Sequence, residues 1–252
     1  CFDVGNTHIT CAFISKKSSE IIFETRIATR KELTEDEIFS TLLSSCDFRD
    51  INIENVKGLI VSSVVSELDE VFEFLGNKYF SITPLFIKST LNLPFSFAIP
   101  DPTTTGADRI CNTAGAVSMF PGKNICVLDL GTATTFEMVK ENTFVGGFII
   151  PGISLQSKAL AANTSKLPVI KVMKTEKRIG ITTLESINKG IYYGYIGQLK
   201  ELISIAKAEI PDAIIVATGG LAPVVKDEIK IDHYIPELCF DGMAQIYKLN
   251  HK

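Results

Sequence analysis

The chain has 252 residues, of which 46% are hydrophobic and 21% charged, and its formal net charge is −4 at pH 7. This composition is ordinary for a folded globular protein, and the length allows one large or two small domains. No basic cluster stands out, which argues against a nucleic-acid partner. No apolar run approaches the ~20 residues of a membrane-spanning helix, and no signal-peptide pattern opens the chain.

The six cysteines are scattered without a Cys-x-x-Cys pair, and the three histidines show no metal-ligand spacing. Most cysteines lie in apolar segments, so we expect reduced core residues, a cytoplasmic setting and no zinc site. Because Cys1 stands only two residues before Asp3, we expect the first strand to begin upstream of this numbering.

The first half is predicted to fold in the order β-β-β-α-β-α-β, which implies a mixed sheet with helices over its faces. Thr34 and Glu37 have capping-box spacing and are expected to begin the first helix, which runs to about Cys46. The strands are expected at 1–4, 9–14, 21–27, 58–64 and 85–87, with a turn at 16–19 and a second helix at 68–79.

Residues 92–106 are rich in proline and threonine, and we expect a substrate-facing loop or a linker. A helix is predicted from Gly106 to the Pro121-Gly122 pair. The second half then repeats the order of the first, with strands to Asp129 and at 134–139, 143–150 and 213–217, and helices at 154–163, 184–206 and 236–249. The apolar stripe of the long helix fits either the core or a dimer interface.

A short motif occurs twice, half a chain length apart. Asp3-Val4-Gly5-Asn6-Thr7 opens the chain, and Asp129-Leu130-Gly131-Thr132-Ala133-Thr134 lies in its middle. We expect Gly5 and Gly131 to adopt positive φ, so that the backbone turns sharply and exposes N–H groups. Such groups bind anionic oxygens, and the neighbouring carboxylate can hold a metal ion.

One copy alone fits an ordinary Asp/Gly turn between strands. Two copies in the same strand order favour a pair of phosphate-binding loops that clamp a nucleotide triphosphate between two domains. Gly219-Gly220 follows a buried strand. The pair is either the plain start of a helix or a turn that lets another group approach the backbone closely. In the second case it would form the adenosine side of the pocket.

Gly106-Ala107-Asp108-Arg109 joins a carboxylate and a guanidinium at a helix start. The alternatives are a capping Asp with an exposed Arg, or a reactive pair. In the second case Arg109 binds a substrate carboxylate and Asp108 accepts the proton of an attacking hydroxyl.

Together these pieces resemble the type III pantothenate kinases, which belong to the acetate kinase, sugar kinase, Hsp70 and actin superfamily. The resemblance covers nearly the whole chain in ordered motifs. These motifs lie at 3–7, 61–65, 106–109, 129–135, 146–152, 166–168, 180–183 and 218–222.

The resemblance implies two ribonuclease H-like (actin-like) α/β domains, residues 1–115 and 116–252. Each would have a five-stranded mixed sheet flanked by helices, with an interdomain cleft. It also implies ATP-dependent phosphorylation of pantothenate to 4'-phosphopantothenate, the first step of coenzyme A synthesis, in a cytoplasmic homodimer.

The resemblance further implies roles for individual residues. Asp108 would be the general base, and Asp129 would hold a monovalent cation, K⁺ or NH₄⁺. Asp3 would bind Mg²⁺ through ATP. The implied pantothenate-binding residues are Gly106, Ala107, Asp108, Arg109, Thr183 (across a dimer interface) and Phe97. The implied ATP-binding residues are Asp3, Val4, Gly5, Asn6, Thr7, His8, Ile9, Thr10, Thr132, Gly219 and Gly220.

The chain departs from the family pattern at several positions. Glu137 stands where aspartate is usual, Phe97 where a pantothenate-side tyrosine is common, and Ser66 where proline is usual. Two other functions fit the motifs less well. One is an inactive regulatory relative that binds nucleotide or pantothenate, and the other is a different kinase or phosphatase of the same superfamily.

Overall fold

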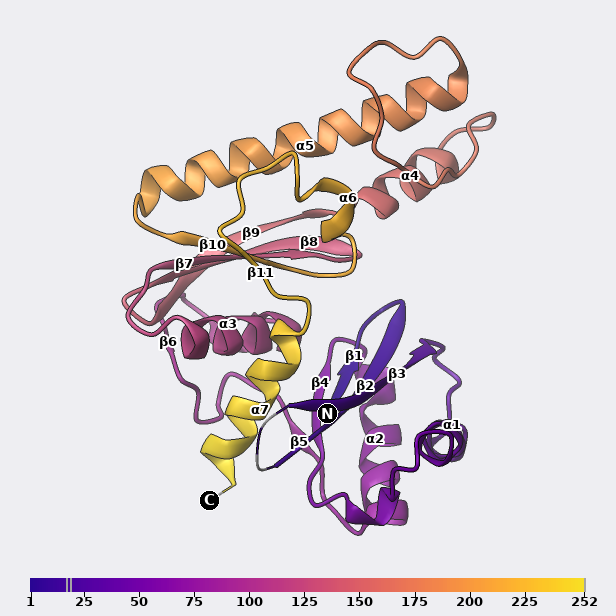
Figure 1. Ribbon diagram of the computed structural model, residues 1–252, viewed down its shortest axis with the longest axis vertical. Coiled ribbons are helices and arrows are strands. Elements are labelled where there is room, and N and C mark those ends of the chain that lie inside the picture. Colours follow the sequence, from indigo (N-terminus) through magenta and orange to yellow (C-terminus); the bar gives the residue numbers. More distant parts are fainter. Residues whose placement is uncertain (17, 19, 252) are drawn as a thin grey trace. The chain divides into compact units, whose positions relative to one another are not determined.

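The computed structural model describes residues 1–16, 18 and 20–251 (Figure 1). The chain forms two compact units. The first comprises Cys1–Pro94, Pro100–Met119 and Leu238–Lys252, and the second comprises Phe95–Ile99 and Phe120–Glu237. The expected boundary at residue 115 assigned the last helix to the second half, whereas its contacts group it with the first unit. The turn expected at 16–19 lies partly outside the described residues.

The first unit contains a five-stranded mixed sheet in the order β3-β2-β1-β4-β5. Its strands are β1 (Phe2–Val4), β2 (His8–Ile14), β3 (Ile21–Ala28), β4 (Ile60–Ser63) and β5 (Leu85–Phe86). The first three strands pair antiparallel, and β4 and β5 continue the sheet in parallel with β1. The predicted order of elements in this half, β-β-β-α-β-α-β with a mixed sheet, is therefore confirmed.

Helices cover both faces of this sheet (Figure 1). They are α1 (Glu35–Asp47), α2 (Asp69–Leu75), α3 (Ala107–Met119) and α7 (Leu238–Asn250), and a π-helical turn, Gly76–Phe80, extends α2. Phe2 and Val4 join α1 and α2 in one apolar core, while α3 and α7 pack against β4. Side chains alternate between faces along a strand. Asp3 therefore points to the α3 and α7 side.

The helices α3 and α7 approach each other closely because two glycines face one another. A Cβ atom at Gly242 would lie 1.8 Å from the carbonyl oxygen of Cys111, and one at Gly115 would lie 2.4 Å from that of Leu238. The capping box that begins α1 is present, with Thr34 accepting from the backbone N–H of Glu37.

The second unit contains a six-stranded sheet in the order β11-β10-β7-β8-β9-β6. Its strands are β6 (Ser96–Phe97), β7 (Ile125–Leu130), β8 (Ala133–Lys140), β9 (Thr143–Pro151), β10 (Ile214–Thr218) and β11 (His233–Tyr234). Its helices are α4 (Ile153–Ala162), α5 (Thr183–Glu209) and α6 (Ala222–Val225). The long α5 packs its stripe, including Ile187, Tyr195 and Leu199, into the core.

Five of these strands repeat the first sheet in both order and direction, as the duplicated motif predicts. The prediction of only five strands is wrong for this sheet. The added strand β6 pairs with β9, and the N–H of Ser96 donates to Asn142 O (3.0 Å). Its two residues are too few to show a strand period in the sequence.

All six cysteines are free thiols, and Cys11, Cys46, Cys111 and Cys126 are buried, as expected for core residues. Among the residues described, no helix combines the length and apolar character needed to cross a membrane.

Candidate active site

The first loop of the repeated motif joins β1 to β2 in the first unit. Asp3 stands in register with Thr10 on β2 and with Ser62 on β4. The N–H of Gly5 donates to His8 O (3.0 Å), and Thr29 Oγ1 donates to Gly5 O (2.6 Å). The loop is therefore held by backbone contacts at its base.

The exposure of the loop residues separates two groups among the predicted ATP ligands. Asn6, Thr7 and His8 are exposed, whereas the side chains of Val4 and Ile9 are fully buried. Val4 and Ile9 belong to the core of the first unit. Only their backbone atoms are available to a ligand.

The prediction of positive φ at Gly5 and Gly131 is wrong, because neither residue adopts it. The glycines instead allow each turn to close on itself. Gly5 N–H bonds to His8 O, and Gly131 N–H bonds to Ala133 O (3.1 Å). A Cβ atom would approach the same oxygens to 3.1 Å and 3.3 Å, closer than most Cβ contacts.

Asp108 lies in the first turn of α3, which begins at Ala107 as predicted. Its Oδ1 accepts a hydrogen bond from the backbone N–H of Arg109 (2.7 Å). A Cβ atom at Gly106 would lie 2.6 Å from the same Oδ1, so glycine leaves room for the carboxylate.

The environment of Asp108 suits a proton acceptor. Burial raises the pKa of its carboxyl above the ordinary value of 3.8, while the Arg109 N–H and guanidinium act in the opposite direction. A carboxylate whose pKa is raised is a stronger base than an ordinary aspartate.

Cys239 in α7 lies within electrostatic reach of two predicted site residues, Asp3 and Asp108. The pKa of its thiol is raised well above the ordinary value, first by a hydrogen bond with Cys111, then by burial and by the negative charges of Asp3 and Asp108. Asp3 points to the α3 and α7 side of the sheet, and Asp108 lies in the first turn of α3, so both carboxylates lie on the side of the sheet that α7 covers. The sequence contains no motif at Cys239, so its position could not be predicted.

The second loop repeats this arrangement in the second unit. Asp129 on β7 is flanked by Thr135 on β8 and Thr218 on β10. Gly219 follows with φ of +92°, and a Cβ atom there would lie 2.5 Å from Asp129 Oδ1 and 2.6 Å from Leu130 O. The Asp129 carboxylate therefore approaches the backbone closely at this turn, and a role of the turn at the adenosine side of the pocket stays a prediction.

A buried hydrogen bond joins the second loop to helix α5. Thr134 Oγ1 and Tyr195 Oη are 2.5 Å apart. Burial raises the pKa of Tyr195 to about 12, and the charge of Asp129 adds to the rise. Thr132 is exposed beside this support, and a Cβ atom at Gly220 would have no atom within 4 Å.

The remaining predicted residues lie elsewhere in the second unit. The ring of Phe97 packs edge-on against Phe95 and Phe144, with centroid distances of 5.1 Å and 5.5 Å. Thr183 is exposed at the first position of α5. Glu137, which departs from the family pattern, is fully buried in β8.

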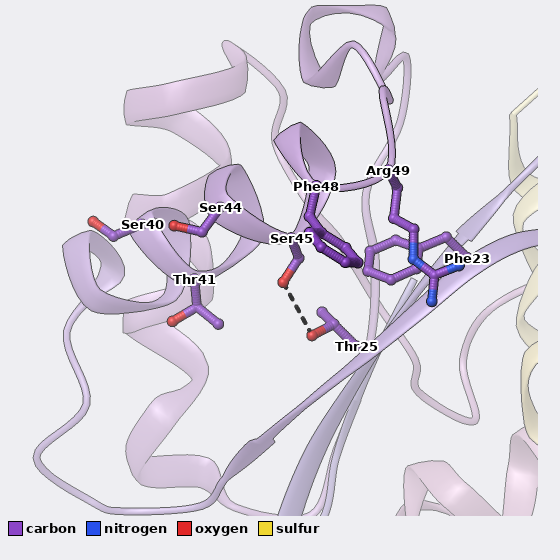
Figure 2. Close-up of a pocket in the computed structure, with 8 residues that line it drawn as sticks. All are labelled: Phe23, Thr25, Ser40, Thr41, Ser44, Ser45, Phe48 and Arg49. Atoms are coloured by element: carbon purple, nitrogen blue, oxygen red, sulfur yellow. Dashed lines mark hydrogen bonds between the residues drawn. The ribbon is translucent and has the colours of Figure 1, made fainter.

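A separate hollow of about 650 Å³ lies over α1 and β3 (Figure 2). Four serine and threonine hydroxyls of α1 border it, and the Arg49 guanidinium stands 5.5 Å from the Phe23 ring centroid. None of the predicted site residues lines this hollow.

Comparison with solved structures identifies the class to which this fold belongs. A Campylobacter jejuni protein described as a putative Baf family transcriptional activator matches with a TM-score of 0.61 at 16% identity, covering 98% of this chain and 96% of that one. A Clostridium difficile activator of 2-hydroxyisocaproyl-CoA dehydratase with bound ADPNP matches at 0.57 and 12% identity, covering 98% and 92%. The chain therefore shares the fold of these solved structures, the actin-like α/β fold, as expected.

Sequence comparison narrows the class to one family. The family model for type III pantothenate kinase matches residues 1–205. A type III pantothenate kinase of Fusobacterium nucleatum is 38% identical over 251 residues, 98% of each chain. One of Legionella pneumophila is 35% identical over 254 residues, 99% of this chain and 98% of that one. The chain belongs to the type III pantothenate kinase family, which confirms the resemblance.

Proposed function

We propose that this protein transfers the γ-phosphoryl group of ATP to the primary hydroxyl of pantothenate, the first step of coenzyme A synthesis. Membership of the family supports this proposal. The observation that carries it is the neighbourhood of Asp3 and Asp108 beside Cys239. A phosphate-side carboxylate and a partly buried carboxylate with raised pKa are the two acids that such a transfer needs.

The ATP-binding residues are proposed from both copies of the motif. In the first unit the exposed side chains of Asn6, Thr7 and His8 are available to the phosphates, together with the backbone from Asp3 to Thr10. In the second unit Thr132 and the Gly219-Gly220 turn are available to the nucleotide. Exposed backbone N–H groups in such turns bind phosphate oxygens.

The donor atoms fit the two proposed cations. Mg²⁺ prefers oxygen ligands and is commonly held by one carboxylate together with substrate phosphates, which suits the partly exposed Asp3. Asp129 Oδ1 and Leu130 O both lie beside Gly219, and oxygen donors of this kind suit K⁺ or NH₄⁺. When bound, these cations would screen the negative charge of the phosphates.

In the proposed reaction, Asp108 accepts the proton as the pantothenate hydroxyl oxygen forms a bond to the γ-phosphorus. The bond from that phosphorus to the bridging oxygen breaks, and ADP leaves. Arg109 binds the pantothenate carboxylate, because a guanidinium matches two carboxylate oxygens. Gly106 and Ala107 give the substrate access to the helix start, and Phe97 supplies an apolar contact where the family pattern has a tyrosine hydroxyl.

We also propose a homodimer in which Thr183 contacts pantothenate bound to the partner subunit. Ile179, Ile181 and Leu184 surround Thr183 and are all exposed. Exposed apolar side chains that gather in one place are typical of an interface. The cytoplasmic location and the lack of nucleic-acid or membrane partners remain predictions.

The test is a coupled assay of ADP release with and without pantothenate, in KCl and in NaCl. We expect release that requires pantothenate, Mg²⁺ and K⁺ or NH₄⁺, together with phosphate incorporated into pantothenate. Release with another alcohol or acid instead would indicate a different kinase of the superfamily. Binding of both substrates without turnover would indicate a regulatory relative.

A further inference from the structure

The hydroxyl of Ser62 occupies an unusual place in the first sheet. Ser62 lies on β4 and is 0% exposed, and no described residue provides a hydrogen-bond partner for its Oγ. It stands in register with Asp3 on the adjacent parallel strand. Residues in register on neighbouring strands project from the same face, and the strands are about 4.8 Å apart. The hydroxyl therefore lies beside the Asp3 side chain.

The second sheet provides an internal comparison. Thr218 on β10 has the same relation to Asp129 that Ser62 has to Asp3. Thr218 is also buried, but its Oγ1 donates to Pro236 O (3.2 Å). Within the described part of the chain, the hydroxyl next to the second carboxylate thus has a hydrogen-bond partner and the hydroxyl next to the first has none.

A buried hydroxyl without a partner destabilises the folded state, because it has lost its hydrogen bonds to water. An alanine would avoid this cost at the same position. Strain and unsatisfied groups of this kind gather at functional sites. The polar groups placed on this face include the Asp3 carboxylate and the Thr10 hydroxyl, which is in register with Asp3 on β2. The charge of Asp3 also raises the pKa of the Cys239 thiol in α7.

We propose that Ser62 is a positioning residue for Asp3. Its hydroxyl donates a hydrogen bond to the Asp3 carboxylate when this carboxylate turns towards the Mg²⁺ of ATP, and so fixes one orientation of the carboxylate. This inference rests on the proposed role of Asp3 in Mg·ATP binding. It assigns Ser62 no contact with either substrate.

The test compares wild type with Ser62→Ala by thermal unfolding, with and without Mg²⁺ and a non-hydrolysable ATP analogue. For ligand-free protein we expect Ser62→Ala to unfold at the same temperature as wild type or higher. With ligand we expect a smaller stabilisation than in wild type. The Mg²⁺ concentration for half-maximal turnover should rise on the order of tenfold, since a hydrogen bond to a charged group is lost.

Ser157→Ala is the matched control. Ser157 is also a buried serine, but its hydroxyl bonds to both the N–H and the carbonyl of Ile170 (3.0 Å and 2.9 Å). We expect this variant to unfold at a lower temperature and to keep the wild-type Mg²⁺ dependence. Ser62→Cys, which retains a weak donor, should recover part of the Mg²⁺ affinity.

Two results would overturn the inference. One is a Ser62→Ala protein that unfolds at lower temperature with unchanged Mg²⁺ dependence, which would make Ser62 a structural residue. The other is an unchanged ligand-induced shift. Failure of the proposed function is recognised separately, because wild type would then release no ADP in response to pantothenate, while the unfolding measurements still report on Ser62.

Discussion

Asp108 combines two requirements that normally oppose each other. A base in phosphoryl transfer must be ionised before the reaction and must hold the proton during it. Burial favours the protonated form of Asp108, while the Arg109 N–H and guanidinium favour the ionised form. The effect of burial is the larger one, so the pKa of Asp108 is raised, while the positive charge of Arg109 still favours the ionised carboxylate.

We predict that Asp108→Asn lowers kcat by ~10²–10⁴, the usual contribution of a placed base. In wild type, the acid limb of kcat/KM should fall at a pH above the ordinary aspartate value of 3.8. Turnover assays from pH 4 to 8 measure both effects. Asp227→Asn, at an exposed carboxylate paired with Lys174, is the control and should leave kcat unchanged.

The same shift makes a prediction about stability. Because the pKa of Asp108 is raised in the folded state, the folded protein binds this proton more tightly than the unfolded chain. The associated stability is present below pH 3.8 and is lost as pH rises through the folded pKa. Asp108→Asn should therefore be at least as stable as wild type at pH 7. A fold lost in this variant would instead point to a structural role for the carboxylate.

Sequence reasoning worked well for residues whose chemistry depends on local motifs. Asp3, Asp108 and Asp129 are found at strand ends or a helix start, where the motifs predict them. The neighbouring residues Ser62, Cys239 and Tyr195 could not be predicted. Their positions depend on strand register and on helices that come from distant parts of the chain, and no local pattern encodes them.

At the level of elements, the junction after β10 shows why a particular glycine is needed. Gly219 has φ of +92°, which non-glycine residues rarely adopt, and its Cα lies against Asp129 and Leu130. Both factors act together, since a side chain would be strained in conformation and would also displace the carboxylate. The turn that leads into α6 therefore also determines the space available to the Asp129 side chain.

We predict that Gly219→Ala destabilises the protein by more than ~1 kcal/mol, because alanine at positive φ is strained and meets Asp129 Oδ1. Urea unfolding measures this effect. Gly220→Ala is the matched comparison for stability, since no atom lies within 4 Å of its added Cβ and its φ is not positive. Equal losses in the two variants would contradict this account of the turn.

The order of the elements could be predicted because the longer strands and helices have clear periods and caps. Thr34 acts as an N-cap as expected. Thr182 also accepts from the N–H of Glu185, while the Glu185 carboxylate accepts from the N–H of Ile181. The strands β6 and β11 were not predicted. Each has only two residues, and its existence depends on a neighbouring strand rather than on its own sequence.

At the level of the whole molecule, the duplication extends from loops to sheets. Both sheets place a carboxylate on the central strand, with hydroxyl side chains in register on each neighbouring strand. The second unit differs from the first in the 27-residue helix α5 and in the segment before it. The exposed apolar residues Ile179, Ile181 and Leu184 lie in this part, which is outside the repeated motif.

The surface around Thr183 combines exposed apolar side chains with exposed glycines of α5. Ile181 is 84% exposed and Ile179 85%, and both lie in the short segment before Thr183. On the outer side of α5, Gly190, Gly194 and Gly197 are exposed and have no atom within 4 Å of an added Cβ. A helix face without side chains permits close approach by a second helix. We infer that these features meet their counterparts in a second copy of the chain, where Thr183 reaches the partner's pantothenate.

We therefore predict that Ile181→Asp converts a dimer into a monomer and raises the KM for pantothenate about tenfold or more, since a desolvated interface does not accept an unpaired charge. Binding of Mg·ATP should persist, because the proposed nucleotide residues lie outside this segment. Sedimentation velocity and steady-state kinetics measure the two effects. Phe48→Asp, at another highly exposed apolar residue in the first unit, should leave both unchanged. A wild type that remains monomeric at micromolar concentration while keeping full activity would refute the shared site.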